Sequence, residues 1–528
     1  MKSPRNVLFI MCDQLRRDHL GCYGHPYLRT HNIDALAARG LRFDQAYVSS
    51  GVCGPSRMSY YTGRTMTSHG ANWNRVPLSI GEITLGEYLR RHGRSLALAG
   101  KTHMMVDKDG MERLEIADDS AVGLRLSTGS FDELDRYDGH HEPGCESGYP
   151  AWLRAQGYNS ARPWSDYVIS VEDGRGLVQS GWQMRNVRWP SRVAEPHSET
   201  AYMTDQAIRY IEAQGDTPWA LHLSYVKPHW PYVAPRPYHD MYSLDQCLPP
   251  VRRKAELDNA HPVLAAYREH EESVNFSRDE VSDTVRPVYQ GLIQQMDDHL
   301  GRLWDTLAKL GRWDDTLIVF TADHGDFLGD HWLGEKEMFY DTVQRVPLIV
   351  YDPSPAADAT RGSVESCFTS CIDVVPTVLD ALGLPPYSER VEGQSLLALT
   401  RRAAHTANTD NAQKWRDYVV SELDYSFRGA RLTLGREPGE CRGWMVRDAY
   451  YKYVHWQGFG PQLFDLQADP DEFVDLGRDL SHESIRSRMH AQLADWHGSL
   501  KQRVTISDAN VASRTNTHKN WGVFFGEW

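Results

Sequence analysis

Short apolar runs that end in charged or polar residues constrain the fold of this chain more than any other feature. Helical patterns alternate with these runs, at 32–39, 201–212 and 287–310. This alternation favours an α/β fold with a mostly parallel central sheet and helices on both of its faces. In such sheets, ligands bind at the carboxyl ends of the strands. We therefore expect one site at the ends of four predicted strands: 6–12 before Asp13-Gln14, 95–99 before Gly100-Lys101-Thr102-His103, 219–225 before Lys227-Pro228-His229, and 316–322 before Asp323-His324-Gly325.

The pattern changes after Leu384-Pro385-Pro386, and a chain of 528 residues exceeds the usual size of one hydrophobic core. Strand-like runs at 417–422, 443–446 and 452–456 precede a helical pattern at 483–500. We predict a larger α/β domain at 1–385 and a smaller α+β domain with an antiparallel sheet at 386–528. Two irregular insertions are expected in the larger domain, at about 104–198 and 235–275. The tryptophans of the first insertion are expected to pack it against the sheet.

The charge balance excludes some classes of function. The formal net charge of −14 argues against a nucleic-acid-binding protein, which would present a basic face. An acidic protein can still bind anions, but only through a locally positive pocket. The apolar run 7–11 is too short for the core of a signal peptide, and no membrane span is predicted. Eight cysteines are scattered without a disulfide or zinc framework, so we expect reduced thiols in a cytoplasmic protein.

The segment Cys53-Gly54-Pro55-Ser56-Arg57 opens a predicted short helix that Gly63 closes. Pro55 suits the first turn because it has no N–H to leave unpaired, and its φ is already helical. Residue 53 would then lie at the positive end of the helix, where an oxyanion is stabilised. On this pattern alone, Cys53 is either part of a reactive site or a buried cysteine before a helix that begins with proline.

Asp13, Gln14, Asp323 and His324 follow two of the predicted strands. Two carboxylates with neutral oxygen or nitrogen donors suit a hard divalent cation. The alternatives are a helix cap for Asp13 and a hydrogen-bonded core histidine for His324. The second alternative is weakened because Asp323-His324-Gly325-Asp326 stands directly after an apolar strand.

The ordered series of these and further segments resembles the sulfatase family within the alkaline phosphatase superfamily, over most of the chain. Each segment alone is a weak signal, whereas the whole series in the family's order is a strong one. The segments are Asp13-Gln14, Cys53 to Arg57, Thr62-Gly63-Arg64, Gly100 to His103, Lys227-Pro228-His229-Trp230-Pro231, Asp323-His324-Gly325, Lys336, 345–349, 372–377, 392–396, 463–466 and 469–472.

The resemblance implies that a maturation enzyme oxidises Cys53 to formylglycine, an aldehyde whose hydrate carries two hydroxyl groups. One hydroxyl would attack the ester, and the other would later expel the product. Residue 53 would hold one divalent metal ion together with Asp13, Gln14, Asp323 and His324. Many sulfatases have Asp and Asn in place of Gln14 and His324, which resemble the branch of choline sulfatases and phosphonate monoester hydrolases. A less charged site with a softer donor makes Mn²⁺ a competitor to Ca²⁺.

The resemblance also implies a positive pocket for the ester. Arg57 would hold the hydrated aldehyde by charge-assisted hydrogen bonds. His229 and Lys336 would bind the sulfuryl group, and one of them would protonate the departing oxygen. Lys101 and His103 keep the Gly-Lys-x-His pattern of sulfatases, which favours sulfate esters over phosphonates. His103 would take the proton from the remaining hydroxyl.

Our first hypothesis is therefore a metal- and formylglycine-dependent sulfatase, with aryl sulfates as the expected substrates. Asn74 is expected to supply a substrate-binding amide. Trp73, Trp230 and Trp332 adjoin motif residues and either stack on an aromatic ring or pack the core. A second hypothesis is a phosphonate monoester or phosphodiester hydrolase with the same nucleophile. The third, a non-catalytic binding module on a degenerate sulfatase fold, is opposed by the retention of Cys53 and the metal residues.

A small anionic ester and the maturation enzyme are the expected partners, and neither nucleic acid nor a membrane is. The tail 501–528 ends in Trp521-Gly522-Val523-Phe524-Phe525. Exposed aromatic residues at a terminus often dock on another surface. This tail therefore predicts a homo-oligomer formed through the C-terminal segment.

Overall fold

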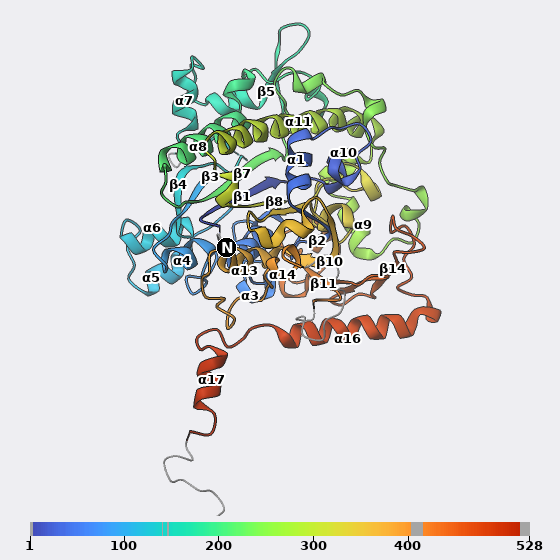
Figure 1. Ribbon diagram of the computed structural model, residues 1–528. Helices are drawn as coiled ribbons and strands as arrows, with labels where there is room; N and C mark the ends of the chain where they lie inside the picture. Colours follow the sequence, from blue (N-terminus) through green and yellow to red (C-terminus); the bar gives the residue numbers. More distant parts are fainter. Residues whose placement is uncertain (1–3, 140, 145–146, 403–414, 518–528) are drawn as a thin grey trace, which may run out of the picture.

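An eight-stranded mixed sheet forms the centre of the protein (Figure 1). The computed structural model describes residues 4–139, 141–144, 147–402 and 415–517. The strand order is β10-β2-β9-β8-β1-β7-β3-β4, and only β9 runs antiparallel to its neighbours. The strands are β1 (Asn6–Asp13), β2 (Leu41–Tyr47), β3 (Leu96–Gly100), β4 (Phe131–Arg136), β7 (Ala220–Pro228), β8 (Thr316–Ala322), β9 (Leu348–Tyr351) and β10 (Val364–Ser370).

Four adjacent strands in the middle of this sheet are the four that the sequence predicts. They lie in the order β8-β1-β7-β3 and are parallel to one another. Every residue of β1, β3, β7 and β8 is buried, as expected for strands that are covered on both faces. The predicted fold class, a mostly parallel sheet with helices on both faces, is confirmed.

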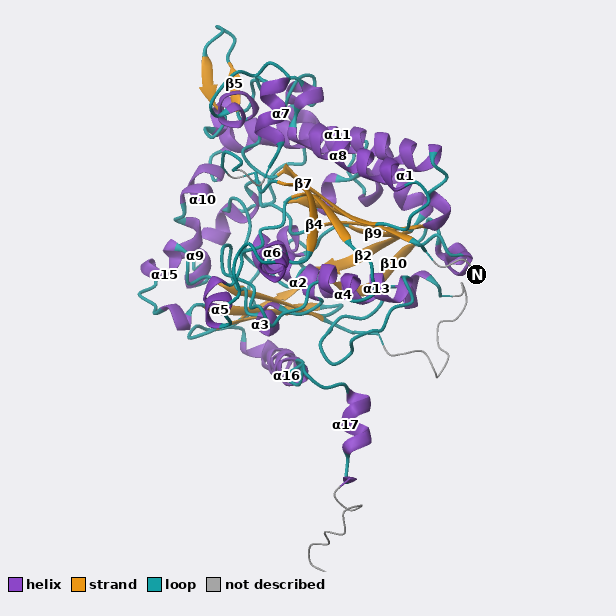
Figure 2. Cartoon of the chain, turned by 90° about the vertical axis from the view of Figure 1, so that its left-hand side faces the viewer, coloured by secondary structure: helices purple, strands orange, loops and turns teal. Residues whose placement is uncertain are grey.

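Helices cover the two faces of the sheet in separate groups (Figures 1 and 2). One face carries α1 (His31–Arg39), α8 (Glu199–Gln214) and α11 (Asp279–Lys309). The other carries α2 (Cys53–Thr62), α3 (Met66–His69), α4 (Leu85–Arg90) and α13 (Val374–Ala381). The remaining helices are α5 (Lys108–Arg113), α6 (Ala121–Thr128), α7 (Tyr149–Ala155), α9 (Pro262–Arg268), α10 (Glu271–Phe276), α12 (Asp341–Gln344), α14 (Leu397–Thr400), α15 (Gly429–Thr433), α16 (Glu483–Ser499) and α17 (Asp508–Arg514).

A second, four-stranded antiparallel sheet follows, as predicted, and helix α16 covers one of its faces (Figure 2). Successive residues of its strands face opposite sides. Met445 packs toward the segment 327–343, whereas its neighbour Val446 packs with Met489 and Leu493 of α16. The strands are β11 (Val419–Asp424), β12 (Arg442–Arg447), β13 (Tyr451–Trp456) and β14 (Gln462–Asp465). The domain boundary at residue 385 stays a prediction.

The two predicted insertions contain more regular structure than the sequence indicates. The first supplies the edge strand β4 and a two-stranded hairpin, β5 (Ser170–Glu172) with β6 (Val178–Ser180). The second includes the short helices α9 and α10. The charged sequence of β4 hides it from a search for apolar runs, and charged residues are typical of an edge strand.

Helix α11 begins earlier than predicted. We expected its start near Pro287, but the helix begins at Asp279 and Pro287 lies inside it. Asp279 and Glu280 favour a start there, since acidic side chains interact well with the positive end of a helix. Val285 and Val288 are buried on either side of Pro287, so packing outweighs the hydrogen bond that the proline removes.

Helix α17 extends away from the rest of the described chain (Figures 1 and 2). The aromatic residues 521–525, on which the predicted oligomer contact depends, lie outside the described residues. None of the helices in the described ranges has the length and apolar character that a membrane span requires.

Gly100 closes β3 immediately before Lys101 and has a φ of 112°. A Cβ added there would lie 1.9 Å from the carbonyl oxygen of Ser224 on β7. We expect Gly100→Ala to lower the thermal unfolding midpoint. Gly93→Ala is the matched control, because Gly93 also has a positive φ but nothing lies within 4 Å of an added Cβ.

The control change should cost only the strain of a left-handed backbone, about 1–2 kcal/mol. Gly100→Ala should cost clearly more, since it adds a clash with a neighbouring strand. Equal midpoints for the two variants, measured by differential scanning fluorimetry, would contradict the close approach of β3 and β7.

Candidate active site

The ends of the four central strands meet at one edge of the sheet and bring the predicted site residues together. Asp13 is the last residue of β1, and Asp323 directly follows β8. Lys101 follows β3, and β7 leads into His229. All four side chains belong to buried residues.

Four of these residues form a compact set of potential metal ligands: Asp13, Cys53, Asp323 and His324. One donor atom from each lies within 4.8 Å of all the others, and all four residues are buried. His324 Nε2 lies 3.0 Å from Cys53 Sγ, 3.8 Å from Asp13 Oδ1 and 3.7 Å from Asp323 Oδ1. We call this set the donor cluster. Its spacing leaves room for a cation that binds its ligands at about 2.0–2.6 Å.

The protonation of the donor cluster suits a cation. Burial alone would raise the pKa of Asp13, but Lys101 and Arg57 outweigh it and hold that pKa well below its ordinary value. Burial lowers the pKa of His324, so its imidazole is neutral near pH 7. His324 Nδ1 donates to the carbonyl oxygen of Gly325 at 2.8 Å, which leaves the Nε2 lone pair directed at the cluster.

Arg57 joins the two carboxylates of the donor cluster. Its Nε donates to Asp323 Oδ2 at 2.8 Å, and its Nη2 lies 3.3 Å from Asp13 Oδ2. Nη1 donates to the carbonyl oxygen of Lys101 and to Ser224 Oγ within β7, so one side chain connects α2 with β7 and with the ends of three other strands. The Lys101 ammonium pairs with Asp13 and is fully buried. Lys101 therefore does not lie on a solvated loop, although it directly follows the strand β3.

Cys53 begins helix α2, whose C-terminal end is capped by Gly63 at a φ of 68°. The Asn74 side-chain oxygen accepts from the backbone N–H of Gly54 at 2.7 Å and fixes the start of this helix. Pro55 is the third helical residue, two positions after the first, and still belongs to the first turn. Burial raises the pKa of the Cys53 thiol to about 11, so an unmodified Cys53 is a neutral thiol near pH 7.

Gln14 links the donor cluster to Lys336. Its backbone N–H donates to Asp323 Oδ1 at 3.0 Å, and its own φ is 63°. Its side-chain oxygen accepts from Lys336 Nζ at 2.9 Å, and its amide nitrogen donates to Asp326 Oδ2 at 2.6 Å. The predicted role of Gln14 as a metal ligand stays a prediction, because its side-chain oxygen here serves Lys336.

Lys336 and His229 lie side by side. Lys336 Nζ is 2.9 Å from His229 Nε2, and His229 Nδ1 donates to the carbonyl oxygen of Trp230 at 2.7 Å. Burial alone would lower the pKa of Lys336, but residue 53 and Glu335 raise it above its ordinary value. Lys336 is therefore a cation that donates to the imidazole.

A cavity of about 880 Å³ adjoins these residues. The predicted residues Asn74, His103, His229 and Lys336 all line it. The other lining residues are Trp73, Arg75, Met104, Met105, Arg136, Asp138, His141, Trp230, Glu272, Glu335, Glu337 and Arg428. Trp332 does not line it: its ring lies 4.5 Å from the Arg252 guanidinium.

The sequence motifs assign no role to three acidic residues near the site. Asp326 accepts hydrogen bonds from Gln14 and from the Tyr232 hydroxyl, both at 2.6 Å. Asp326 is the last residue of the motif Asp323-His324-Gly325-Asp326, and this position in the motif was the sequence signal that could have revealed it. Glu335 and Glu337 flank Lys336 on backbone with positive φ, 58° and 95°, and no sequence pattern marks them.

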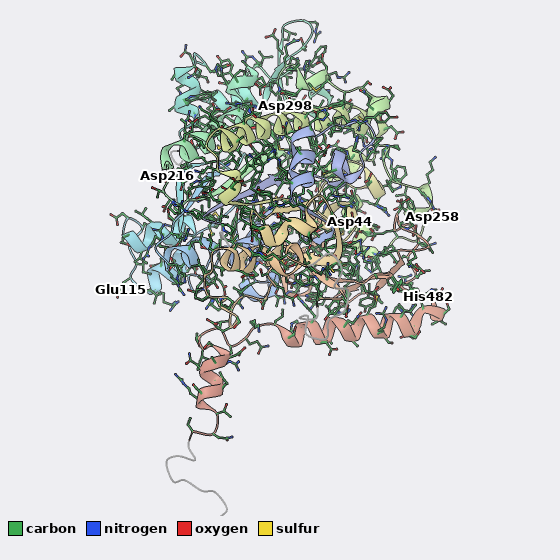
Figure 3. The ribbon with its side chains drawn as sticks, viewed as in Figure 1. Asp44, Glu115, Asp216, Asp258, Asp298 and His482 are labelled. Carbon is green, nitrogen blue, oxygen red and sulfur yellow. The ribbon has the colours of Figure 1, made fainter. Side chains whose placement is uncertain are left out.

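The cavity lining is balanced in charge and is not positive as a whole, since it holds the cations Arg75, Arg136, Lys336 and Arg428 and the acids Asp138, Glu272, Glu335 and Glu337. Exposed acids such as Glu115, Asp216 and Asp258 lie at the outline of the molecule (Figure 3). Buried cations instead gather beside the donor cluster, where Arg57, Lys101 and Lys336 are all less than a tenth exposed.

Known proteins resemble this chain over most of its length. A family model described as sulfatase matches residues 5–384, and one described as N-sulphoglucosamine sulphohydrolase, C-terminal, matches residues 329–499. The multifunctional alkaline phosphatase superfamily protein PehA of Trinickia caryophylli is 32% identical, over 98% of this chain and 97% of its own. An arylsulfatase of Clostridium perfringens is 27% identical over 92% of each chain. The structure of the phosphonate monoester hydrolase SpPMH from Silicibacter pomeroyi matches with a TM-score of 0.82 and 27% identity, over 96% of this chain and 98% of that one.

Replacement of a donor-cluster carboxylate should weaken metal binding. We expect Asp323→Asn to lower the affinity for Mn²⁺ or Ca²⁺ by more than about 10-fold, since even outer partners of metal ligands contribute 10–100-fold. Metal content per chain after gel filtration, measured by mass spectrometry of the elements, gives the readout.

Asp352→Asn is the matched control. Asp352 is also a buried aspartate after a strand of the main sheet, but it pairs with Arg401 at the opposite edge. The control should keep the metal content of the wild-type protein. Equal metal content in all three proteins would show that the donor cluster is not a metal site.

Proposed function

The chain belongs to the sulfatase family, and we propose that it hydrolyses sulfate monoesters, aryl sulfates above all, with a divalent cation and a formylglycine formed from Cys53. The observation that carries this proposal is the position of residue 53. It stands at the positive end of α2, within the donor cluster and beside a cavity lined by His229 and Lys336. Membership of the family identifies the chain as a hydrolase.

An unmodified Cys53 fits the chemistry poorly. The thiolate is the reactive form of cysteine, and without a bound cation burial raises the pKa of the Cys53 thiol to about 11, which leaves almost no thiolate at neutral pH. A hydrated aldehyde would instead offer oxygen nucleophiles. A bound divalent cation would supply positive charge that favours the ionised form of such a hydroxyl. Because Cys53 is fully buried, we propose that the maturation enzyme acts before the chain has folded.

We assign the handling of protons to the cavity residues. His229 holds its Nδ1 proton against the Trp230 carbonyl, so only Nε2 can exchange a proton with the substrate. Lys336 donates toward that Nε2. Nε2 can therefore take a proton from Lys336 and pass it to a departing alkoxide or phenoxide oxygen. The lysine is left neutral by this transfer and recovers its proton from solvent. Until the transfer, its positive charge stabilises the transferring group. His103 lines the same cavity and is proposed to take the proton of the second hydroxyl.

The carboxylates around the Arg57 guanidinium suggest that this residue supports other residues of the site. Its hydrogen bonds go to Asp13, Asp323 and Ser224 and to the Lys101 carbonyl. We propose that it compensates the carboxylates and holds residue 53 in place. Lys101 compensates Asp13 in the same way.

Hydrolysis of phosphonate monoesters is the second candidate. The similarity to SpPMH, a phosphonate monoester hydrolase, over nearly the whole chain favours it. A sulfate monoester and a phosphonate monoester each carry one negative charge, so the same cations suit both. His103 in the cavity wall remains the feature that favours sulfate, whereas the Lys101 ammonium is directed at Asp13.

Replacement of the proposed nucleophile tests the function. Cys53→Ala should lower turnover by more than about 10³-fold, as loss of a nucleophile does in other hydrolases. It should leave folding and metal content largely intact, because Asp13, Asp323 and His324 remain as donors. Rates on 4-nitrophenyl sulfate and on 4-nitrophenyl phenylphosphonate, compared for the wild-type protein, decide between the two candidates.

Cys441→Ala serves as the control, because Cys441 is equally buried but lies in the second sheet region. It should retain wild-type turnover. If Cys53→Ala kept most of the activity, the assignment of the nucleophile would be wrong. A wild-type protein without activity on either ester and without bound metal would favour a non-catalytic binding module.

A further inference from the structure

We propose that Lys227, paired with Glu199, is a positioning residue that fixes the orientation of His229. The proposal rests on the proposed function, since it gives His229 the part of a proton donor. Neither Lys227 nor Glu199 lines the cavity, so they would act through the backbone of the loop that follows β7.

The Lys227 ammonium holds two carbonyl groups of this loop. Its Nζ donates to the carbonyl oxygen of Pro231 at 2.9 Å and to that of His229 at 3.4 Å. The side chain is only 7% exposed, so these hydrogen bonds form away from water, where they are stronger. The contacts fix the carbonyl groups on both sides of Trp230.

The carbonyl group of Trp230, which lies between those of His229 and Pro231, fixes the position of the proton on the His229 ring. It accepts from His229 Nδ1 at 2.7 Å, and this determines which ring nitrogen carries the proton. His229 Nε2 then faces Lys336 Nζ at 2.9 Å. A shift of the loop would therefore change both the direction of the imidazole and its tautomer.

Glu199 supports Lys227 from the first turn of α8. Its Oε2 lies 3.6 Å from Lys227 Nζ, and its side chain is 5% exposed. Its Oε1 accepts from Trp164 Nε1 at 2.7 Å and from the Tyr137 hydroxyl. Removal of one partner from a buried charge pair leaves the other charge uncompensated. Lys227 therefore depends on Glu199 to remain a cation in this position.

This arrangement gives the first insertion a role. Tyr137 and Trp164 both belong to the segment predicted as an irregular insertion, and both rings are buried. Through Glu199 and Lys227, that segment supports the loop that carries His229. Trp164 is buried in the same hydrophobic core as the strands of the sheet, and in addition it donates a hydrogen bond to a charged group.

The dependence of the reaction rate on the leaving group distinguishes a positioning role of Lys227 and Glu199 from a general structural role. Protonation by an acid matters most when the departing oxygen is strongly basic, and it matters little for a good leaving group. Loss of His229 orientation should therefore slow a phenyl ester much more than a 4-nitrophenyl ester. A variant that is only less stable should slow both esters equally.

The test compares Lys227→Met and Glu199→Gln with the wild-type protein on a phenyl and a 4-nitrophenyl ester of whichever acid the wild type hydrolyses. Glu199→Gln is the more selective variant, because the amide oxygen can still accept from Trp164 and Tyr137 while its NH₂ group opposes Lys227. We expect kcat for the phenyl ester to fall by about 10–100-fold, the range for partners of functional residues, and kcat for the 4-nitrophenyl ester by less than about 3-fold.

Arg312→Met is the control for loss of a mostly buried ion pair. Arg312 pairs with Asp315 before β8, at the edge of the sheet away from the site. It should leave the ratio of the two rates unchanged even if the unfolding temperature falls. If Lys227→Met does not fold, Glu199→Gln decides the outcome alone.

His229→Ala, measured on the same two esters, separates the possible failures. One outcome is that His229→Ala slows the phenyl ester more than the 4-nitrophenyl ester, whereas the folded Lys227 and Glu199 variants slow both esters equally. The positioning role is then overturned, and the proposed function stands. If His229→Ala slows both esters equally, His229 is not the proton donor and the inference fails with it. The Cys53→Ala experiment would still test the nucleophile independently.

Discussion

The mutual compensation of buried charges around Arg57 is the interaction on which the site depends. Asp13 and Asp323 end neighbouring parallel strands, so the sheet forces two carboxylates close together without water. Arg57 bridges them and Lys101 pairs with Asp13. Loss of one partner from such a buried pair typically costs about 3–5 kcal/mol. Because Arg57 lies one turn after residue 53 on α2, the same interaction holds the proposed nucleophile against the donor cluster.

The second sheet supports the candidate active site through the chain segment around Lys336. Its apolar face packs on the segment 327–343, which carries Lys336. The fully buried Lys452 of β13 donates to the carbonyl oxygen of Phe339 and to Asp341, and it pairs with Glu472. Glu472 also accepts from the backbone N–H of Asp341 at 2.9 Å. The C-terminal segment 469–472 thus anchors the chain a few residues after Lys336. This contact gives a structural role to a family segment that lies far along the chain from the other site segments.

The sequence predicts the centre of the sheet and the residues at its edge, because buried parallel strands are apolar throughout and polar residues at their ends stand out. It does not predict β4, whose charged residues suit an edge, or the early start of α11 before Pro287. The positions of Gln14 and Lys101 depend on side-chain partners that no pattern in the chain specifies. Lys227 was visible in a motif, but its role depends on Glu199 and Trp164, which only the folded chain brings to it. The metal-ligand and catalytic assignments remain predictions that chemistry must test.

The central claim is that residue 53 works as an oxidised side chain and not as a thiol. Mass spectrometry of the tryptic peptide 43–57, from protein purified from its native cells, tests it most directly when turnover is measured on the same preparations. The account predicts that turnover rises in proportion to the fraction of the peptide that carries an aldehyde in place of the thiol. Full turnover by a preparation in which this peptide carries only the thiol would contradict it.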